Sequence, residues 1–255
     1  MSLNEDAYGR LIYDHHRGRR SAEVIERDDG WFDLSSGAPS YFAPFPRWPL
    51  VERRAIRAVR GRVLDVGCGA GRVALYLQAR GHEVVSIDNS PLAVTTCVER
   101  GVRDARVCSI TQVGHRLGRF DTIVMFGNNF GLFGNLRRAR WLLRRFHKLT
   151  SPTARIVAES RNPYRGASVD HRKYHELNRR RGRLPGQIRL RVRWGHTRTP
   201  WFDYLLVSPH EMRAIVRGTG WQVTKVVRAS GPLYVGVLTK VRRPAIDRAV
   251  QASCS

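Results

Sequence analysis

The feature that most constrains the fold is a short apolar segment that runs directly into a cluster of glycines. Residues 62–66 (RVLDV) form the apolar segment, and residues 67–71 (GCGAG) follow it. A helical pattern then leads to a second apolar segment at 83–87, which ends at Asp88. Strand, glycine turn, helix and strand in this order predict a right-handed crossover between two parallel strands.

The same alternation continues along the chain. Further strands are expected at 105–109, 120–126, 154–159, 221–227 and 233–239. Helices are expected after Ser90-Pro91, over 135–150, and after the capping box Ser208-Pro209-His210-Glu211. Because the last two strands read as a closing hairpin, the pattern predicts an α/β fold with a seven-stranded, mostly parallel sheet and an antiparallel last strand.

Two regions fall outside this alternation. Residues 1–61 contain a predicted helix at 4–16, an aromatic and proline-rich stretch at 41–49 and a predicted helix at 50–60; residues 162–207 contain a predicted helix at 170–180 and strands at 187–194 and 201–207. Long excursions from a compact core are commonly functional. We therefore expect an N-terminal cap (1–61) and an inserted cap on the substrate side (162–207) over a core formed by 62–161 and 208–241.

Composition narrows the class of protein. The chain has 255 residues, 42% of them hydrophobic, which suits a globular domain with an extra cap. No segment approaches the ~20 apolar residues that span a bilayer, and the start, MSLNEDAYGR, has no apolar signal core. We expect a cytoplasmic protein with no membrane partner.

Charge and cysteine content point less directly to function. The formal net charge is +24, but only four of the 45 basic residues are lysines, which indicates an arginine-biased composition as much as a selected surface. The cysteines Cys68, Cys97, Cys108 and Cys254 show no paired metal-ligand spacing. They are expected to be reduced thiols, and no metal site is predicted.

The glycine turn indicates a bound adenosine cofactor. Glycines allow the backbone to approach a ligand closely, the following helix presents its positive N-terminus, and Asp88 can accept hydrogen bonds from ribose hydroxyls. The dinucleotide pattern G-x-G-x-x-G is not met, because the third glycine comes one position early and Arg72 occupies the final position. No Walker-type lysine is present either. The alternative, a tight turn without a ligand, remains.

The sequence Leu64-Asp65-Val66-Gly67-Cys68-Gly69-Ala70-Gly71 resembles the first motif of class I S-adenosylmethionine-dependent methyltransferases. The resemblance covers roughly residues 60–160 and implies a Rossmann-like core and S-adenosylmethionine as cofactor. A longer set of segments, including 127–134 and 201–204, resembles a poorly characterised prokaryotic subgroup of small-molecule type. The cofactor-binding residues that the resemblance implies are Asp65, Gly67, Cys68, Gly69, Gly71, Asp88, Asn89, Ser109, Ile110 and Phe126.

Within this resemblance, Asp65 would hold the methionine amino end and Asp88 the ribose. Asn89 would lie beside the ribose, and Ser109 with Ile110 would flank the adenine. Methyl transfer from an activated sulfonium chiefly requires alignment and exclusion of water, so a dedicated catalytic residue is not obligatory.

The segment after the fourth predicted strand bears on the acceptor. Enzymes that methylate amino groups of bases commonly carry Asn or Asp followed by Pro-Pro and an aromatic residue here, whereas this chain has Gly127-Asn128-Asn129-Phe130. That form is similar to small-molecule methyltransferases. Asn128 is therefore a candidate catalytic residue and Asn129 a candidate substrate residue; alternatively, both cap the loop.

The cap supplies the other candidates. His171, Tyr174 and His175 share one helix face, and His171 and His175 are either packing residues, general bases or, last, metal ligands. Tyr174, Tyr41 and Arg161 are candidate substrate residues. The expected partner is a small-molecule acceptor.

An alternative function is an RNA-directed methyltransferase or a cofactor-dependent RNA-binding protein. It is motivated by the excess of basic residues over 161–200, where 11 arginines and one lysine face two acidic residues. No recognisable RNA-binding module accompanies them. The sequence predicts neither the oligomeric state nor the atom that accepts the methyl group.

Overall fold

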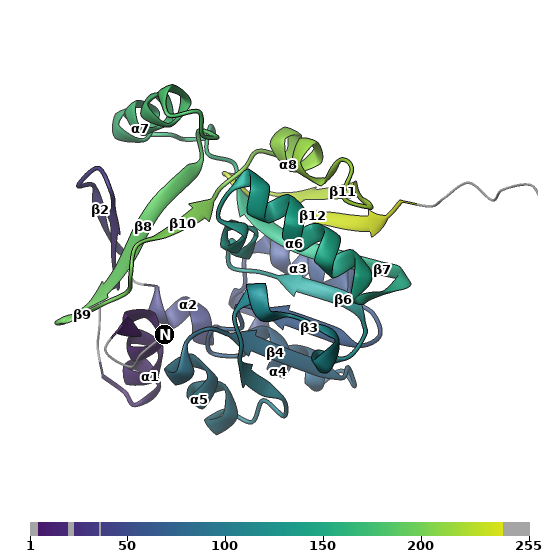
Figure 1. Ribbon diagram of the computed structural model, residues 1–255. Helices are drawn as coiled ribbons and strands as arrows, with labels where there is room; N and C mark the ends of the chain where they lie inside the picture. The colour runs from purple at the N-terminus through teal and green to yellow at the C-terminus, as the bar shows by residue number, and fades with distance from the viewer. Residues whose placement is uncertain (1–4, 20–22, 36, 242–255) are drawn as a thin grey trace, which may run out of the picture.

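Two separate β-sheets organise the computed structural model, which describes residues 5–19, 23–35 and 37–241 (Figure 1). The larger, or core, sheet has the strand order β11-β12-β7-β6-β3-β4-β5. Its strands are β3 (Val63–Val66), β4 (Val84–Asp88), β5 (Ala105–Val107), β6 (Phe120–Met125), β7 (Thr150–Arg161), β11 (Trp221–Arg228) and β12 (Leu233–Lys240). Neighbours from β5 to β7 are parallel, whereas β12 is antiparallel to both β7 and β11. The predicted α/β fold with seven strands is confirmed.

Helices cover both faces of the core sheet because successive strand residues point to opposite faces. Leu64 and Val66 of β3 pack in the apolar cluster that contains α6 and α8, whereas Val63 packs in the cluster that contains α3 and α4. The helices of this unit are α3 (Leu50–Ala55), α4 (Arg72–Gln78), α5 (Pro91–Glu99), α6 (Leu136–Lys148) and α8 (Pro209–Val216). Short 3-10 turns lie at η2 (Phe45–Arg47), η3 (Ile56–Ala58), η4 (Ile110–Gln112), η5 (His115–Leu117) and η6 (Asn129–Phe133).

The second, or cap, sheet joins the two regions that the sequence sets apart. It has the order β10-β8-β1-β2, with β9 paired to β8, and all its pairs are antiparallel. Its strands are β1 (Glu23–Arg27), β2 (Phe32–Ser35), β8 (Gln187–Trp194), β9 (Thr197–Arg198) and β10 (Phe202–Leu205). The expected strand at 187–194 is confirmed, but β1 and β2 were missed. Their signal is the Asp-Asp-Gly turn at 28–30 between two residue runs of high strand propensity.

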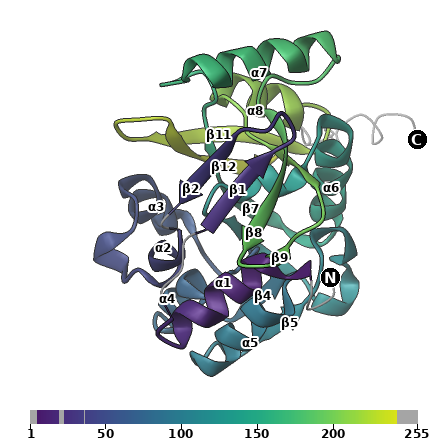
Figure 2. The ribbon, with the colours of Figure 1, turned by 90° about the vertical axis from the view of Figure 1, so that its left-hand side faces the viewer.

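Helices α1 (Ala7–His16), α2 (Ala38–Phe42) and α7 (Val169–Arg180) complete the cap region. Seen from the side of the cap, β1, β2 and β8 lie in front of the core strands, with α7 above them and α1 below (Figure 2). Asp6 joins α1 to the core, since its carboxylate accepts hydrogen bonds from the Ser90 hydroxyl (2.8 Å) and the Leu92 N–H (3.1 Å). The β8 residues Leu190 and Val192 are buried on the inner face of the cap sheet.

Several element boundaries differ from the predictions for local reasons. β5 ends at Val107 because Ser109 caps the following turn through the Thr111 N–H. β7 extends to Arg161 because its last residues pair with β12. The helix expected over 50–60 ends at Ala55, and the backbone of Arg60 instead bonds to the Thr122 hydroxyl. Asn4, at the start of the first predicted helix, and Cys254 lie outside the described residues.

Candidate functional site

The glycine turn between β3 and α4 forms the floor of the candidate site. Gly67 and Gly69 adopt left-handed backbone conformations, with φ of 72° and 55°. A Cβ atom on Gly67 would lie 2.5 Å from the Asn129 amide nitrogen, so a larger residue cannot fit there. The turn is closed by a hydrogen bond from the Gly71 N–H to the Cys68 carbonyl (2.9 Å).

Asp88, at the end of β4, closes the turn from the side. Its carboxylate accepts hydrogen bonds from the Gly69 N–H and the Ser90 N–H, each at 3.0 Å. Burial raises the pKa of Asp88 to about 6. The Asn89 backbone contributes a further hydrogen bond, and because an ionised carboxylate has about four acceptor positions, at least one remains for a hydroxyl group of a ligand.

Asp65, near the end of β3, is a buried carboxylate that lacks a full set of partners. The side chain is 2% exposed, and its Oδ2 has no hydrogen-bond partner among the described residues. Burial raises its pKa to about 7, against the opposing effect of the Arg72 guanidinium. An unpaired buried carboxylate is costly. The ammonium group of a bound ligand would satisfy it, so Asp65 fits the role that the resemblance implies.

These groups open into a cavity of about 750 Å³ lined by residues of the core edge and of the cap sheet. The cavity brings together all but one of the predicted site residues. They are Asp65, Gly67, Cys68, Gly69, Asp88, Asn89, Ser109, Ile110, Phe126, Asn128, Asn129, Tyr41, Arg161, His171, Tyr174 and His175.

Gly71 is the exception, and the ligand contact expected of it stays a prediction. It lies outside the cavity lining and faces α5, where a Cβ atom would lie 2.6 Å from Val102 Cγ2 and 3.0 Å from Cys97 Sγ. Its φ is 76°. The residue is therefore required for close packing between the turn and the helix.

The loop after β6 is fixed to the glycine turn by hydrogen bonds. Asn129 donates both amide hydrogens to the turn, at 2.9 Å to the Val66 carbonyl and 2.8 Å to the Gly67 carbonyl. Its amide nitrogen is therefore engaged within the protein, and the contact of Asn129 with a substrate stays a prediction. Asn128 has φ of 63°, its carbonyl accepts a hydrogen bond from the Tyr204 hydroxyl (2.8 Å), and its Oδ1 is buried without a partner.

A buried charged cluster behind this loop was missed from the sequence. Arg72 donates two hydrogen bonds to Glu52, at 2.6 and 2.7 Å, and Glu52 also accepts the Gly127 N–H at 3.2 Å. Glu159 accepts the Asn128 N–H at 3.2 Å, and burial together with Glu52 raises its pKa well above the ordinary value. The available signal was a lone glutamate on the apolar face of the helix at 50–55. The cluster fixes the loop backbone at the cavity wall.

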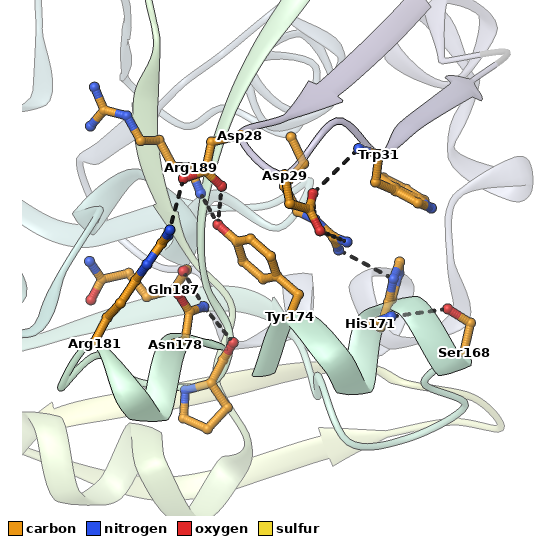
Figure 3. A network of polar contacts seen from close by, with 12 residues as sticks. Asp28, Asp29, Trp31, Ser168, His171, Tyr174, Asn178, Arg181, Gln187 and Arg189 are labelled. Carbon is orange, nitrogen blue, oxygen red and sulfur yellow. Dashed lines mark hydrogen bonds and ion pairs between the residues drawn. The ribbon is translucent and has the colours of Figure 1, made fainter. Parts of the chain in front are cut away.

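Helix α7 and the β1–β2 hairpin bring the cap candidates together (Figure 3). The Tyr174 hydroxyl donates to Asp28 (2.5 Å) and accepts the Arg189 N–H (3.2 Å). Its ring lies 4.2 Å from the Arg27 guanidinium carbon. The hydroxyl of Tyr174 therefore holds the cap together, and only the remainder of the side chain is left to line the cavity.

His171 contacts the same arginine, which decides its tautomer. Arg27 Nη1 lies 3.4 Å from His171 Nδ1, and arginine can only donate. The Nδ1 lone pair is therefore occupied, and the neutral ring carries its hydrogen on Nε2. Burial, Arg27 and Arg161 lower the pKa of His171, so the ring stays neutral at pH 7. In this arrangement the Nε2–H of His171 is a hydrogen-bond donor, which does not favour the predicted role of general base.

His175 lies one turn further along α7. It is 7% exposed, and its ring packs edge-on against Tyr164, with the ring centroids 5.8 Å apart. Burial and Arg179 lower its pKa. No group of three His, Cys, Asp or Glu side chains that could hold a metal ion occurs in the described part of the chain. Within the same residues, no helix has the length and apolar character needed to cross a bilayer.

Comparisons with known proteins agree with this geometry. Residues 63–153 match the methyltransferase-domain family model. The crystal structure of an S-adenosylmethionine-dependent methyltransferase from Bacteroides fragilis, in complex with S-adenosyl-L-homocysteine, superposes with a TM-score of 0.80. It is 26% identical, and the match covers 95% of this chain and 98% of that one.

Two curated relatives match over shorter segments. Glycine/sarcosine N-methyltransferase of Halorhodospira halochloris is 30% identical over 43% of this chain and 42% of its own. The 2-heptyl-1-hydroxyquinolin-4(1H)-one methyltransferase of Mycobacteroides abscessus is 40% identical over 26% of this chain and 32% of its own. The chain thus spans less than half the length of these relatives. Residues 63–153 thus match a methyltransferase domain, and the seven-stranded fold and the glycine turn agree with the class I methyltransferases that use S-adenosylmethionine as cofactor.

Proposed function

We propose that this protein transfers the methyl group of S-adenosylmethionine to a small-molecule acceptor held between the core edge and the cap sheet. The observation that carries the proposal is the single cavity that joins Asp65 and Asp88 to the residues of the cap. The names of the two curated relatives specify glycine or sarcosine and a quinolone. Both relatives support a small molecule as the acceptor.

In this proposal the cofactor lies along the carboxyl ends of the core strands. Asp88 accepts hydrogen bonds from the ribose hydroxyls, and the unpartnered Oδ2 of Asp65 accepts from the ammonium group. Asn89, Ser109 and Ile110 surround the adenosine end. The backbone of Gly67, Cys68 and Gly69 forms the floor, and Phe126 forms part of the wall.

When bound, the cofactor supplies a methyl group already activated by a positively charged sulfur. The work left for the chain is to align the acceptor and to exclude water. The buried cluster of Glu52, Arg72 and Glu159 holds the loop at 127–128, so that Asn128 Oδ1 is fixed at the cavity wall. Where the acceptor arrives protonated, His175 is the proposed base, since its lowered pKa leaves it neutral at pH 7.

We further propose that residues 1–61 and 162–207 act together as the cap over a core formed by 62–161 and 208–241. The register of β1 against β8 supports this, because it joins the two regions in one sheet. The cap side of the cavity then selects the acceptor, with Tyr41 and the ring of Tyr174 among its walls.

The ion pairs of the cap favour a small acceptor over RNA. Arginines on the outer face of β8 are paired with carboxylates, with Arg191 and Arg193 on Glu26 and Arg189 on Asp203. These carboxylates offset part of the basic charge of 161–200. Binding of bulk RNA at rising salt tests the alternative, and strong binding at physiological salt would support it.

Calorimetric titration with S-adenosyl-L-homocysteine tests the cofactor site. We expect Asp88→Asn and Asp88→Ala to weaken binding about tenfold or more, because hydrogen bonds to a charged group are lost. Asp104→Ala is the control, since Asp104 pairs only with Arg106 at the surface. Unchanged affinity in folded Asp88 variants would refute the ribose assignment. Release of S-adenosyl-L-homocysteine on incubation with candidate amines and carboxylic acids then tests transfer itself.

A further inference from the structure

The two ends of the cavity differ in charge along the edge of the core sheet. Asp88 ends β4 and Asp65 lies near the end of β3, whereas Arg161 ends β7, two strands beyond β3. At a strand spacing of about 4.8 Å, β7 lies about 10 Å from β3. The carboxylates that suit the cofactor therefore lie at one end, and the other end begins with a cation.

At that end, two arginines of the lining have no side-chain partner among the described residues. The lining contains Arg27, Arg72, Arg138, Arg161 and Arg165. The first three donate to Asp29, Glu52 and the Leu132 carbonyl. For the Arg161 and Arg165 side chains, no hydrogen bond, ion pair or ring contact occurs with any described residue.

The adjoining wall adds a third donor. His171 follows on α7, and because Arg27 occupies its Nδ1, its Nε2–H is the ring group left to a ligand. Arg27 itself is held in place, since it is 4% exposed and its Nε lies 2.7 Å from Asp29 Oδ1. Carboxylates also line the cavity on the cap side, at Glu23, Asp33 and Asp203, but none forms a salt bridge with Arg161 or Arg165 within the described residues.

We propose that the methyl acceptor carries a carboxylate, and that Arg161, Arg165 and the Nε2–H of His171 bind it at the end of the cavity beside β7. The three donors at this place match an anionic oxygen group, and paired guanidinium groups suit a carboxylate. With its carboxylate here, the acceptor extends toward Asn128 and the cofactor end. This inference rests on the proposed function and specifies the class of its substrate.

The test uses wild-type protein saturated with S-adenosyl-L-homocysteine and three acid and amide pairs: acetate with acetamide, hexanoate with hexanamide, and benzoate with benzamide. Affinities are measured by calorimetry at pH 7.5 and constant ionic strength. We expect at least one acid to bind about tenfold or more tightly than its amide, as hydrogen bonds to charged groups allow. No preference in any pair would overturn the proposal.

Variants then test which residues cause the preference for the acid over its amide. Arg161→Gln and Arg165→Gln should each reduce it about tenfold, and Arg198→Gln should leave it unchanged, because Arg198 lies outside the lining. His171→Gln, which keeps a donor, should retain more of the preference than His171→Leu. An equal loss in Arg198→Gln would show that only the overall positive charge attracts the acid, and would overturn the proposal.

Affinity for S-adenosyl-L-homocysteine distinguishes a failure of the proposed function from a failure of the carboxylate assignment. If wild-type protein does not bind it, the proposed function fails. If binding is intact in wild type and in all these variants, but no acid is preferred, only the carboxylate assignment fails.

Discussion

The core and the cap are stabilised in different ways. Two extensive apolar clusters pack against the faces of the core sheet, whereas the buried apolar cluster of the cap sheet consists of Ala7, Leu190 and Val192. The cap adds charged contacts such as those of Arg191 and Arg193 with Glu26. Because apolar burial stabilises more than exposed ion pairs, the core can tolerate a carboxylate as costly as Asp65. In the proposed function, the region with the larger apolar core binds the cofactor, and the cap sheet faces the acceptor.

The largest effect is expected from packing at the glycine turn. Gly71→Ala should destabilise the fold by about 3 kcal/mol or more, because a left-handed residue is strained and the new Cβ meets Val102. Gly81→Ala is the matched control, since Gly81 has φ of 82° and no atom within 4 Å of the added Cβ. It should cost about 1–2 kcal/mol. Denaturant unfolding measures both, and equal losses would contradict the packing role.

The next largest effect concerns the loss of folding stability that burial of the Asp65 carboxylate causes. Its pKa rises from 3.8 to about 7 on folding, so the folded state binds the proton more tightly. Ionisation therefore destabilises the fold fully above pH 7, and the penalty declines as the pH falls toward 4. Asp65→Asn should gain stability relative to wild type at pH 8, and this gain should shrink by roughly 2–3 kcal/mol at pH 5.

The same substitution should weaken binding of S-adenosyl-L-homocysteine, since the ammonium group loses its carboxylate. Unfolding curves and calorimetry at both pH values measure the two effects. A stability difference independent of pH would show that the Asp65 carboxylate has a partner in the apo protein.

A smaller effect is expected in the cap from Tyr174→Phe. The substitution removes the hydrogen bond to Asp28 and leaves the Arg189 N–H without its partner, at a cost of about 1–2 kcal/mol. Tyr76→Phe is the control, because no hydrogen bond of the Tyr76 hydroxyl occurs within the described residues. Amide hydrogen exchange should accelerate in β8 but not in β3. Acceleration in both strands would mean that cap and core open together.

The smallest effect is expected from Glu26→Gln, which weakens the contacts with Arg191 and Arg193. Because these groups are partly exposed, the loss should be at most about 1 kcal/mol and should shrink in high salt. Hydrogen exchange of β1 and β8 at low and high salt measures it. A loss that does not depend on salt would show that packing, not charge, holds these strands together.

Features that depend on residues close together in the sequence were predicted, whereas contacts between residues far apart in the sequence were missed. The bounds of β8 followed from alternating Ile188, Leu190 and Val192, and the capping box of Ser208 and Glu211 was confirmed, because both are local patterns. The pairing of β1 with β8 was missed, since it joins residues more than 160 positions apart. No local pattern specifies such a partner.

The residues of the candidate site likewise fall into two groups: those predicted from local spacing and those brought together only by contacts between distant segments. The spacing of the glycines with Asp65 and Asp88 predicted the cofactor end, because one strand–turn–helix–strand unit carries all of these residues. The role of Asn129 was missed, since both its amide hydrogens go to the turn at 66–67, far back along the chain. The cluster of Glu52, Arg72 and Glu159 was missed for the same reason.

The sequence by itself determined the fold class and predicted the cofactor, because these follow from short-range periodicity and spacing. Only the tertiary structure decided that the two excursions build one sheet, that Gly71 packs against Val102 and Cys97, and that Arg27 occupies Nδ1 of His171. The state of the His171 ring depends on Arg27, which folding brings to it from a strand 144 residues away. Hydrogen-bond partners set the tautomer of a histidine, and residue spacing along a helix carries no information about them.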